Sequence, residues 1–481
     1  MERQNAWKKY NRDNLAELEQ VCAQYRQFLN TGKTERECVQ LAASMAREKG
    51  YRDLQEVLET GGSLQPGDKV YRICMQKTIA LFQIGQKPLP EGMRILGAHI
   101  DSPRLDLKQN PLYEDTDLAY LDTHYYGGVK KYQWVTMPLA IHGVVAKKDG
   151  SVVTIAIGEE EDDPIFCVTD LLIHLSAEQL EKKARVVIEG EALDVLAGSR
   201  PFLAEEDGSK GADSKREEAG SKAFDNKKEA VKAFALEILK EKYDMDEEDF
   251  LSAELEVVPA WKARDLGFDR SMIAGYGQDD RICAFTSLAA MLDVENPVYT
   301  TCCLLVDKEE IGSVGATGMH SRFFENTIAE LLACLGGGHY LDLDLRNALR
   351  RSKMFSCDVA AAYDPLYGAA FEKKNSAYLG RGLVFNKYTG SRGKSHANDA
   401  NAEYIAWIRK VLDENDVCFQ TAEVGKVDQG GGGTIAYISS VYGMDIIDGG
   451  VAILSMHAPL EVASKADIYE AKKGYAAFLR S

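Results

Sequence analysis

The order of apolar and polar positions predicts helices first and strands after them. Apolar residues recur at helical spacing over 14–29 and 34–49. Thr34 with Glu37 three residues later has the pattern of a capping box at the start of the second helix. From Lys69 the pattern becomes extended through VYRIC, TIALFQIG and RILGAHI. We therefore expect two packing helices followed by the first strands of a sheet.

In the middle of the chain, strand patterns replace helical ones. Between about Leu105 and Pro259 the segments WVTMPLAIHGVVA, SVVTIAI, ARVVIEGEAL and AELEVVPA have the alternation of strands, with few helical patterns. This pattern predicts a β-rich domain over 105–259, inserted between two parts of one α/β domain at 1–104 and 260–481.

One segment of the insert is strongly polar. Residues 205–230 contain Gly, Ser and dense mixed charge with almost no large apolar side chain. Such a composition predicts an exposed, mobile loop. We expect a helix after it, near 226–242.

Composition narrows the class of protein. With 481 residues and 45% hydrophobic content, the chain is typical of a globular protein with two domains. Ten scattered cysteines without a C-x-x-C pair argue against a zinc ribbon or a disulfide scaffold. A polar N-terminus and the lack of a long apolar run predict a cytoplasmic protein with no membrane partner. The net charge of -18 argues against nucleic acid and favours a free peptide as partner.

Five segments combine an apolar run with ionisable residues: GAHIDSP, GQDDRICAF, LLVDKEEIGS, FSCDVAAAYDP and LSMHAPLE. If RILGA, TTCCLLV, KMFSC and VAILSM are buried strands, the residues beyond them meet at the rim of an α/β sheet. The candidate residues, in chain order, are His99, Asp101, Asp279, Glu309, Glu310, Asp358 and His457.

This set of side chains predicts a two-metal site. Imidazole and carboxylate suit zinc, cobalt or manganese, and two such ions about 3.5–4 Å apart can hold a water and a scissile carbonyl together. Two His and three carboxylates, one of them bridging, supply roughly three protein ligands per ion, and one carboxylate remains for proton transfer. Taken singly, each residue also fits a turn, a helix cap or a solvated helix face. The joint order His, Asp, Glu-Glu, Asp, His favours a two-metal hydrolase.

At these motifs the chain resembles the aspartyl aminopeptidase and vacuolar-type aminopeptidase I group of dinuclear zinc aminopeptidases. The resemblance covers nearly the whole chain. Its most specific stretches are AHIDSPRLDLK, QDDR, DKEEIGS and SMHAPLE, supported by KYTGSRGKS, DANAEY and QGGGGTIA. It implies a three-layer αβα catalytic domain of the zinc-peptidase type, with the inserted domain serving oligomerisation.

The resemblance also implies a division of the metal ligands. His99 and Glu310 would hold one ion together with a bridging Asp279. Asp358 and His457 would hold the other.

Further roles follow from the same resemblance. Glu309 would be the general base that activates the bridging water, and Asp101 would orient the ring of His99. Relatives with this site hold the peptide bond after the bridging Asp in the cis form, which here implies a cis bond between Asp279 and Asp280.

The resemblance extends to assembly and substrate. It implies a dimer building block and a closed tetrahedral shell of twelve subunits that admits peptides. His174 matches in position a histidine that helps to bind substrate in the neighbouring active site, although an interior structural role explains it equally well. In the family the QGGGG segment borders the substrate pocket, so Lys387 and Asp428 near it are candidate substrate-binding residues. The remaining histidines have no partner pattern and predict structural or exposed roles: His124, His142, His320, His339 and His396.

Several functions remain open at this stage. The QGGGG segment predicts close backbone approach, because no Gly-Lys-Ser/Thr follows it as in a phosphate loop. Its four glycines differ from the acid-selective members, so the N-terminal residue removed is either acidic or neutral to hydrophobic. Two other functions compete with this aminopeptidase interpretation. One is a carboxypeptidase or deacylase that uses the same site, and the other is a catalytically silent assembly subunit. The long gap between His99 and Asp279 places the insert before the Glu-Glu pair and favours an aminopeptidase acting on peptides with a free N-terminus.

Overall fold

The computed structural model describes residues 3–201 and 229–481. The chain forms two compact units, one made of residues 1–103 and 262–481 and the other of residues 104–261. The predicted polar loop at 205–230 lies, up to residue 228, outside the described residues.

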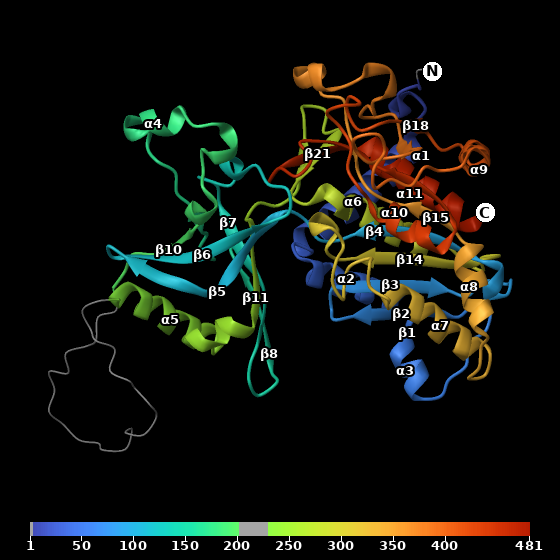
Figure 1. The fold of residues 1–481 in the computed structure, drawn as a ribbon, viewed down its shortest axis with the longest axis horizontal. Helices are drawn as coiled ribbons and strands as arrows, with labels where there is room; N and C mark the ends of the chain where they lie inside the picture. The colour runs from blue at the N-terminus through green and yellow to red at the C-terminus, as the bar shows by residue number, and fades with distance from the viewer. Residues whose placement is uncertain (1–2, 202–228) are drawn as a thin grey trace. The chain divides into compact units, whose positions relative to one another are not determined.

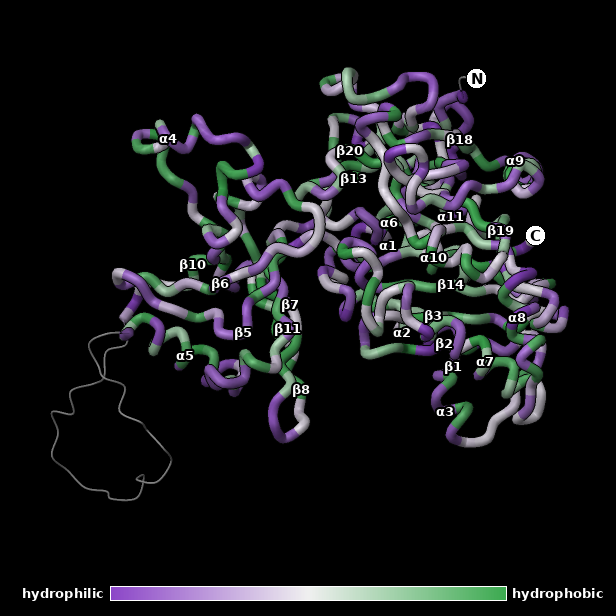
Figure 2. Tube along the Cα trace, viewed as in Figure 1, coloured by the Kyte–Doolittle hydropathy of each residue, from purple (hydrophilic) through white to green (hydrophobic). Residues whose placement is uncertain are grey.

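The first unit is built on a nine-stranded sheet (Figure 1). Its middle strands β14, β4, β15 and β19 run parallel to one another. β3, β14 and β4 are buried along their whole length, which is why apolar residues dominate them. Figure 2 shows this for β3 and β14. In sheet order the strands are β1 (Arg52–Asp53), β2 (Lys69–Cys74), β3 (Thr78–Gln83), β14 (Thr300–Val306), β4 (Met93–His99), β15 (Lys353–Ser356), β19 (Asp445–Gly450), β17 (Leu383–Asn386) and β18 (Phe419–Thr421).

Helices cover both faces of this sheet, so the predicted three-layer αβα architecture is confirmed. Along β4, Leu96 and Ala98 join one apolar core and Met93 and Ile95 join the other, as alternation across a strand requires. The first core includes residues of α1 (Arg12–Thr31), α2 (Glu35–Glu48), α6 (Gln278–Leu292), α9 (Ala402–Glu414) and α11 (Lys465–Arg480). The second includes residues of α3 (Leu54–Glu59), α7 (Phe323–Leu335), α8 (Asp342–Arg350) and α10 (Ile435–Ser439).

The two N-terminal helices are as predicted. Thr34 is the N-cap of α2, and its side chain accepts from the backbone N–H of Glu37 while the Glu37 side chain accepts from Thr34. This reciprocal arrangement is the predicted capping box.

A smaller five-stranded sheet completes the first unit, and it corrects one expectation. The apolar run VAILSM does not enter the large sheet: it forms β20, and the preceding segment, β19, takes the place beside β15. Which sheet a short apolar strand joins depends on distant pairing partners that local alternation does not specify. In order, the strands are β12 (Arg264–Leu266), β13 (Met272–Gly275), β21 (Glu461–Ser464), β20 (Ala452–Leu454) and β16 (Ala360–Ala361).

The second unit is a seven-stranded sheet with α5 (Ala230–Tyr243) packed on β5, β6 and β10. A helix was expected near 226–242, and α5 lies there. Its strands, in sheet order, are β8 (Val152–Ile157), β7 (Leu139–Ala146), β11 (Ala253–Pro259), β5 (Arg104–Asp115), β6 (Leu118–Tyr126), β10 (Val195–Gly198) and β9 (Cys167–Val168). A short helix, α4 (Ala177–Leu180), lies in the connection between β9 and β10.

One strand prediction for this unit is wrong. ARVVIEGEAL forms two 3₁₀ turns, Ala184–Val186 and Gly190–Ala192, instead of a strand. Val186 is 43% exposed, so the alternation of this segment does not correspond to one buried and one open face. Strand propensity alone is a weak guide where no neighbouring strand offers pairing.

No helix in the described part of the chain is long and apolar enough to cross a membrane. The ten cysteines, all within the described ranges, form no disulfide.

Candidate metal centre

Three neighbouring parallel strands bring five of the candidate residues to one edge of the large sheet. His99 ends β4, with Asp101 two residues beyond it. Glu309 and Glu310 open a 3₁₀ turn just after β14, and Asp358 follows β15. Since β14 and β15 both pair in parallel with β4, their carboxyl ends meet at the same rim.

The other two candidates reach this rim from the smaller sheet. Asp279 lies at the start of α6, after β13 and the left-handed Gly277 (φ 69°). His457, itself left-handed (φ 65°), lies in the loop between β20 and β21.

Asp279 lies at the centre of the group. Its Oδ1 is 3.2 Å from Nε2 of His99, and its Oδ2 is 3.2 Å from Nε2 of His457. On the His99 side, Oδ1 of Asp358 is 3.9 Å from Nε2. On the His457 side, Oε2 of Glu310 is 3.5 Å from Nε2. One carboxylate thus faces two imidazoles, and each imidazole has a second carboxylate beside it.

These distances favour a pairing that differs from the one implied by the resemblance. Glu310 lies beside His457, and Asp358 lies beside His99. The reason is topological: Asp358 follows β15, which is directly adjacent to the strand that ends in His99.

The ring of His99 is held from behind by Asp101. Nδ1 of His99 lies 2.9 Å from the backbone oxygen of Asp101, so Nδ1 carries the proton and the lone pair of Nε2 points toward Asp279. The Asp101 carboxylate accepts from the backbone N–H groups of Glu309 (3.1 Å) and Glu310 (3.2 Å). Asp101 therefore positions both the histidine and the Glu-Glu turn.

Glu309 is close enough to act on a group held between the imidazoles. Its Oε2 is 4.0 Å from Nε2 of His99, and its side chain is 16% exposed. Burial raises the pKa of the Glu309 carboxyl to about 7. A carboxyl with a pKa near neutrality is suited to both accepting and returning a proton.

The electrostatics of the cluster fit divalent cations. Burial raises the pKa values of Glu310 and Asp358 well above the ordinary carboxyl range, and nearby carboxylates add to the rise. Oε1 of Glu310 and Oδ1 of Asp280 are buried without a hydrogen-bond partner among the described residues. Two sets of potential ligand atoms lie within 4.8 Å of one another, His99 with Asp279 and Glu310, and His99 with Asp280 and Asp358. Imidazole nitrogens and unpartnered carboxylates are the donors that zinc, cobalt and manganese take.

One buried carboxylate of this region was not among the residues predicted from the sequence. Glu461, 1% exposed at the start of β21, accepts from the backbone N–H of Asp279 (3.1 Å) and from that of His457 (2.8 Å). Its backbone oxygen accepts from Gln278 (2.7 Å). Glu461 thus joins the turns that carry two of the candidate ligands. The signal was present, since Glu461 ends the SMHAPLE motif.

The predicted cis peptide bond between Asp279 and Asp280 is confirmed.

The predicted substrate residues lie outside this cluster. Lys387 is exposed and 4.0 Å from Asp399, and Asp428 is exposed. His174, in the second unit, is exposed, so the interior structural role considered for it is wrong. Of the other histidines, His142 is buried beside Glu159 (3.2 Å), and His124 is exposed.

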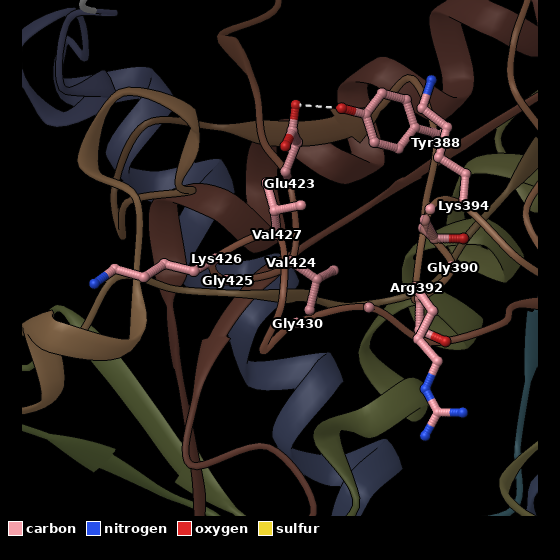
Figure 3. Close-up of a pocket in the computed structure, with 14 residues that line it drawn as sticks. Tyr388, Gly390, Arg392, Lys394, Glu423, Val424, Gly425, Lys426, Val427 and Gly430 are labelled. Atoms are coloured by element: carbon pink, nitrogen blue, oxygen red, sulfur yellow. Dashed lines mark hydrogen bonds between the residues drawn. The ribbon is translucent and has the colours of Figure 1, made fainter.

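The glycine-rich segment lines a pocket of about 210 Å³ between residues 388–394 and 423–431 (Figure 3). A Cβ on Gly430 would lie 1.5 Å from the Val424 oxygen, and one on Gly431 would lie 1.7 Å from the Gly390 oxygen. The predicted close backbone approach is therefore confirmed. Thr434, just after these glycines, donates to Asp448 of β19, which pairs with the last residue of β15. The pocket wall is thus tied to the sheet edge from which Asp358 emerges.

Comparison with known proteins decides the family. A family model described as aminopeptidase I zinc metalloprotease (M18) matches residues 28–479. The chain belongs to this family. It is a zinc aminopeptidase, a hydrolase of peptide bonds, as the sequence predicted.

Individual relatives agree over the full length. The enzyme is 58% identical to a probable M18 family aminopeptidase 1 of Clostridium acetobutylicum, over 100% of this chain and 98% of that protein. The crystal structure of an M18 family aminopeptidase from Thermotoga maritima superposes with a TM-score of 0.90 at 42% identity, covering 100% of this chain and 99% of that one. The mApe1 dodecamer of S. cerevisiae shares the fold at 18% identity, with a TM-score of 0.73 and coverage of 95% and 96%.

Proposed function

We propose that this enzyme removes N-terminal amino acids from peptides with two divalent metal ions in each subunit, zinc in the cell and cobalt or manganese as substitutes. The observation that carries the proposal is the position of Asp279, whose two carboxylate oxygens each lie 3.2 Å from a different imidazole Nε2. A carboxylate placed in this way would serve as a ligand shared by two ions.

The neighbours of Asp279 complete the ligand sets. His99 and Asp358 would hold one ion, and Glu310 and His457 would hold the other, because these are the pairs with the short distances. When bound, the two ions polarise the scissile carbonyl and acidify the attacking water.

Side chains of the protein carry out the proton transfers. Oε2 of Glu309 accepts the proton of the attacking water and passes it to the nitrogen of the leaving peptide. Asp101 keeps Glu309 in place through the backbone of the turn. The free α-amine of the substrate would dock at a metal or at an acidic side chain of the rim.

We further propose that N-terminal Asp and Glu are accepted. The pocket between residues 388–394 and 423–431 has three cations in its lining, Arg392, Lys394 and Lys426, and Glu423 as the described carboxylate. The hydroxyl of Tyr388 donates to Glu423 (2.6 Å), which occupies that carboxylate (Figure 3). Lys394 is paired with Asp399 (3.1 Å), so the charges of Arg392 and Lys426 are the ones that favour an acidic side chain. A neutral or hydrophobic preference is the alternative.

A panel of aminoacyl p-nitroanilides tests this function. We expect hydrolysis that stops after treatment with a chelator and returns with Zn²⁺, Co²⁺ or Mn²⁺, with Asp and Glu substrates among the better ones. N-acetylated versions of the same substrates are the control, because an aminopeptidase leaves them intact. Release of acetate from the blocked series would establish a deacylase, and removal of the C-terminal residue from N-acetyl dipeptides with a free carboxyl terminus would establish a carboxypeptidase.

We propose a homodimer as the building block and a closed tetrahedral dodecamer as the assembly. The S. cerevisiae dodecamer, which shares the fold, supports this. So does the segment around His174 in the second unit, which exposes large apolar side chains: Ile165, Leu171, Leu172, Ile173, Leu175 and Leu180. Exposed apolar residues in such number indicate a protein interface. His174 would then reach the active site of the neighbouring subunit.

Charge placed on this segment is expected to break the assembly. The double variant Ile173→Asp/Leu175→Asp should lower the mass measured by sedimentation to that of a monomer or dimer, because it puts two charges into an apolar contact. Leu366→Asp, at another exposed leucine (87%), is the matched control. A wild-type enzyme that is monomeric and fully active would contradict both the interface and the role of His174.

We also propose a cytoplasmic location. Ten unpaired cysteines, most of them buried, support a reducing compartment.

A further inference from the structure

The first unit contains a strongly basic pocket that none of the candidate metal ligands lines. We call it the basic groove, defined by Arg3, Lys373, Lys374, Arg381 and Arg409, and its volume is about 940 Å³. No Asp or Glu lines it among the described residues. The chain as a whole has 75 acidic and 57 basic residues, so this cluster of positive charge contrasts with the negative net charge of the chain.

The cations come from separate parts of the chain. Lys373 and Lys374 lie on a short 3₁₀ turn, Arg381 lies just before β17, and Arg409 lies on α9. β18, which contributes Gln420 and Thr421 to the lining, is the last strand in the order of the large sheet. The charges are therefore spread over four separate segments of the chain that line the same pocket as the edge strand β18.

Aromatic rings hold several of these cations in position. Arg3 lies over the ring of Phe419 (4.1 Å), Arg381 over Tyr378 (4.3 Å) and Lys373 over Tyr363 (5.5 Å). Within the described ranges, Lys373, Lys374 and Arg409 form no ion pair with a carboxylate. Their charge is thus available to a ligand.

We propose that the basic groove binds an acidic peptide segment, an extended stretch that carries several Asp or Glu side chains. The volume exceeds what a single phosphate or amino acid fills, and the spread of the cations matches charges repeated along a chain. The exposed Thr421 on the edge strand offers backbone groups of the kind that pair with an extended peptide. Side-chain carboxylates would meet the lysines and arginines, while the exposed Thr421 would face the peptide backbone.

Direct binding tests the proposal independently of catalysis. The probe is octaglutamate, with fluorescein on its N-terminus and an amide at its C-terminus, so that no free amine is present for the aminopeptidase site. Binding to the full-length, metal-loaded enzyme is followed by fluorescence anisotropy at low ionic strength. We expect saturable binding that weakens as salt is added.

Charge-reversal variants locate the site. Lys373→Glu/Lys374→Glu should weaken octaglutamate binding by about tenfold or more, because four units of charge change beside the ligand. Lys49→Glu/Lys262→Glu is the matched control, since both lysines are exposed on the same unit and the change in charge is the same. Both variants should hydrolyse aminoacyl p-nitroanilides like the wild type, which shows that they are folded.

Three results would overturn the proposal. One is the absence of saturable binding to the wild type, or an equal loss in both variants. Another is a groove that binds tripolyphosphate but not octaglutamate, which would assign it to phosphate anions. The third is a change in solution mass in Lys373→Glu/Lys374→Glu alone, which would make the groove a contact between copies of the chain.

Discussion

Replacing Glu309 by Gln is expected to lower kcat by about 10²- to 10⁴-fold while both metal ions stay bound. The amide keeps the size of the side chain, but it cannot accept a proton from the attacking water. The backbone N–H of residue 309 still donates to Asp101, so the turn keeps its shape. Steady-state kinetics and metal analysis by mass spectrometry on the same sample measure the two effects.

Glu48→Gln is the matched control for this substitution, because Glu48 is an exposed glutamate of α2. It should leave kcat and metal content unchanged. Turnover near the wild-type value in Glu309→Gln, with two ions bound, would exclude Glu309 as the base.

Replacing Asp279 by Ala is expected to remove both metal ions and, with them, measurable activity. Asp279 faces both imidazoles, so its loss takes one ligand from each ion at once. The ion count per subunit should fall from two toward none.

Two further variants make this result specific. Asp279→Asn keeps the shape of the side chain but has only one oxygen, so it should also lose at least one ion. Asp413→Ala, at an exposed aspartate of α9, should keep both. If Asp279→Ala is folded by circular dichroism and still contains two ions per subunit, Asp279 is not the bridge.

The strands that carry the candidate ligands were predictable because their signal is strong and local. β4, β14 and β15 lie between helix layers, so nearly every position along them is buried and apolar residues dominate. The ionisable residue after each strand marks where the chain leaves the core. The capping box of α2 was predictable for the same reason, since its two partners are three residues apart.

The pairing of the ligands was not predictable from the order of motifs along the chain. Asp358 lies beside His99 because β15 is next to β4 in the sheet, and strand order is a matter of long-range pairing. Likewise, the run that forms β20 has the same apolar pattern as a central strand, and only its partners place it in the smaller sheet.

Local alternation also misled where burial was incomplete. The valines of ARVVIEGEAL suit a strand, but the segment has no neighbouring strand to pair with in the structure and folds into turns. Glu461 is fully buried and was overlooked although it ends the SMHAPLE motif. Its importance lies in two backbone N–H groups that no reading of side chains reveals.

The double role of Glu461 bears on any attempt to transplant this centre into another protein. A designer who copied only the imidazoles and carboxylates at the rim would leave the turns before α6 and before β21 free to drift apart. The buried Glu461 carboxylate accepts hydrogen bonds from the backbone of both turns and so fixes their positions relative to each other. A minimal working copy would therefore need Glu461 and the loop from His457 to β21 as much as the ligands themselves.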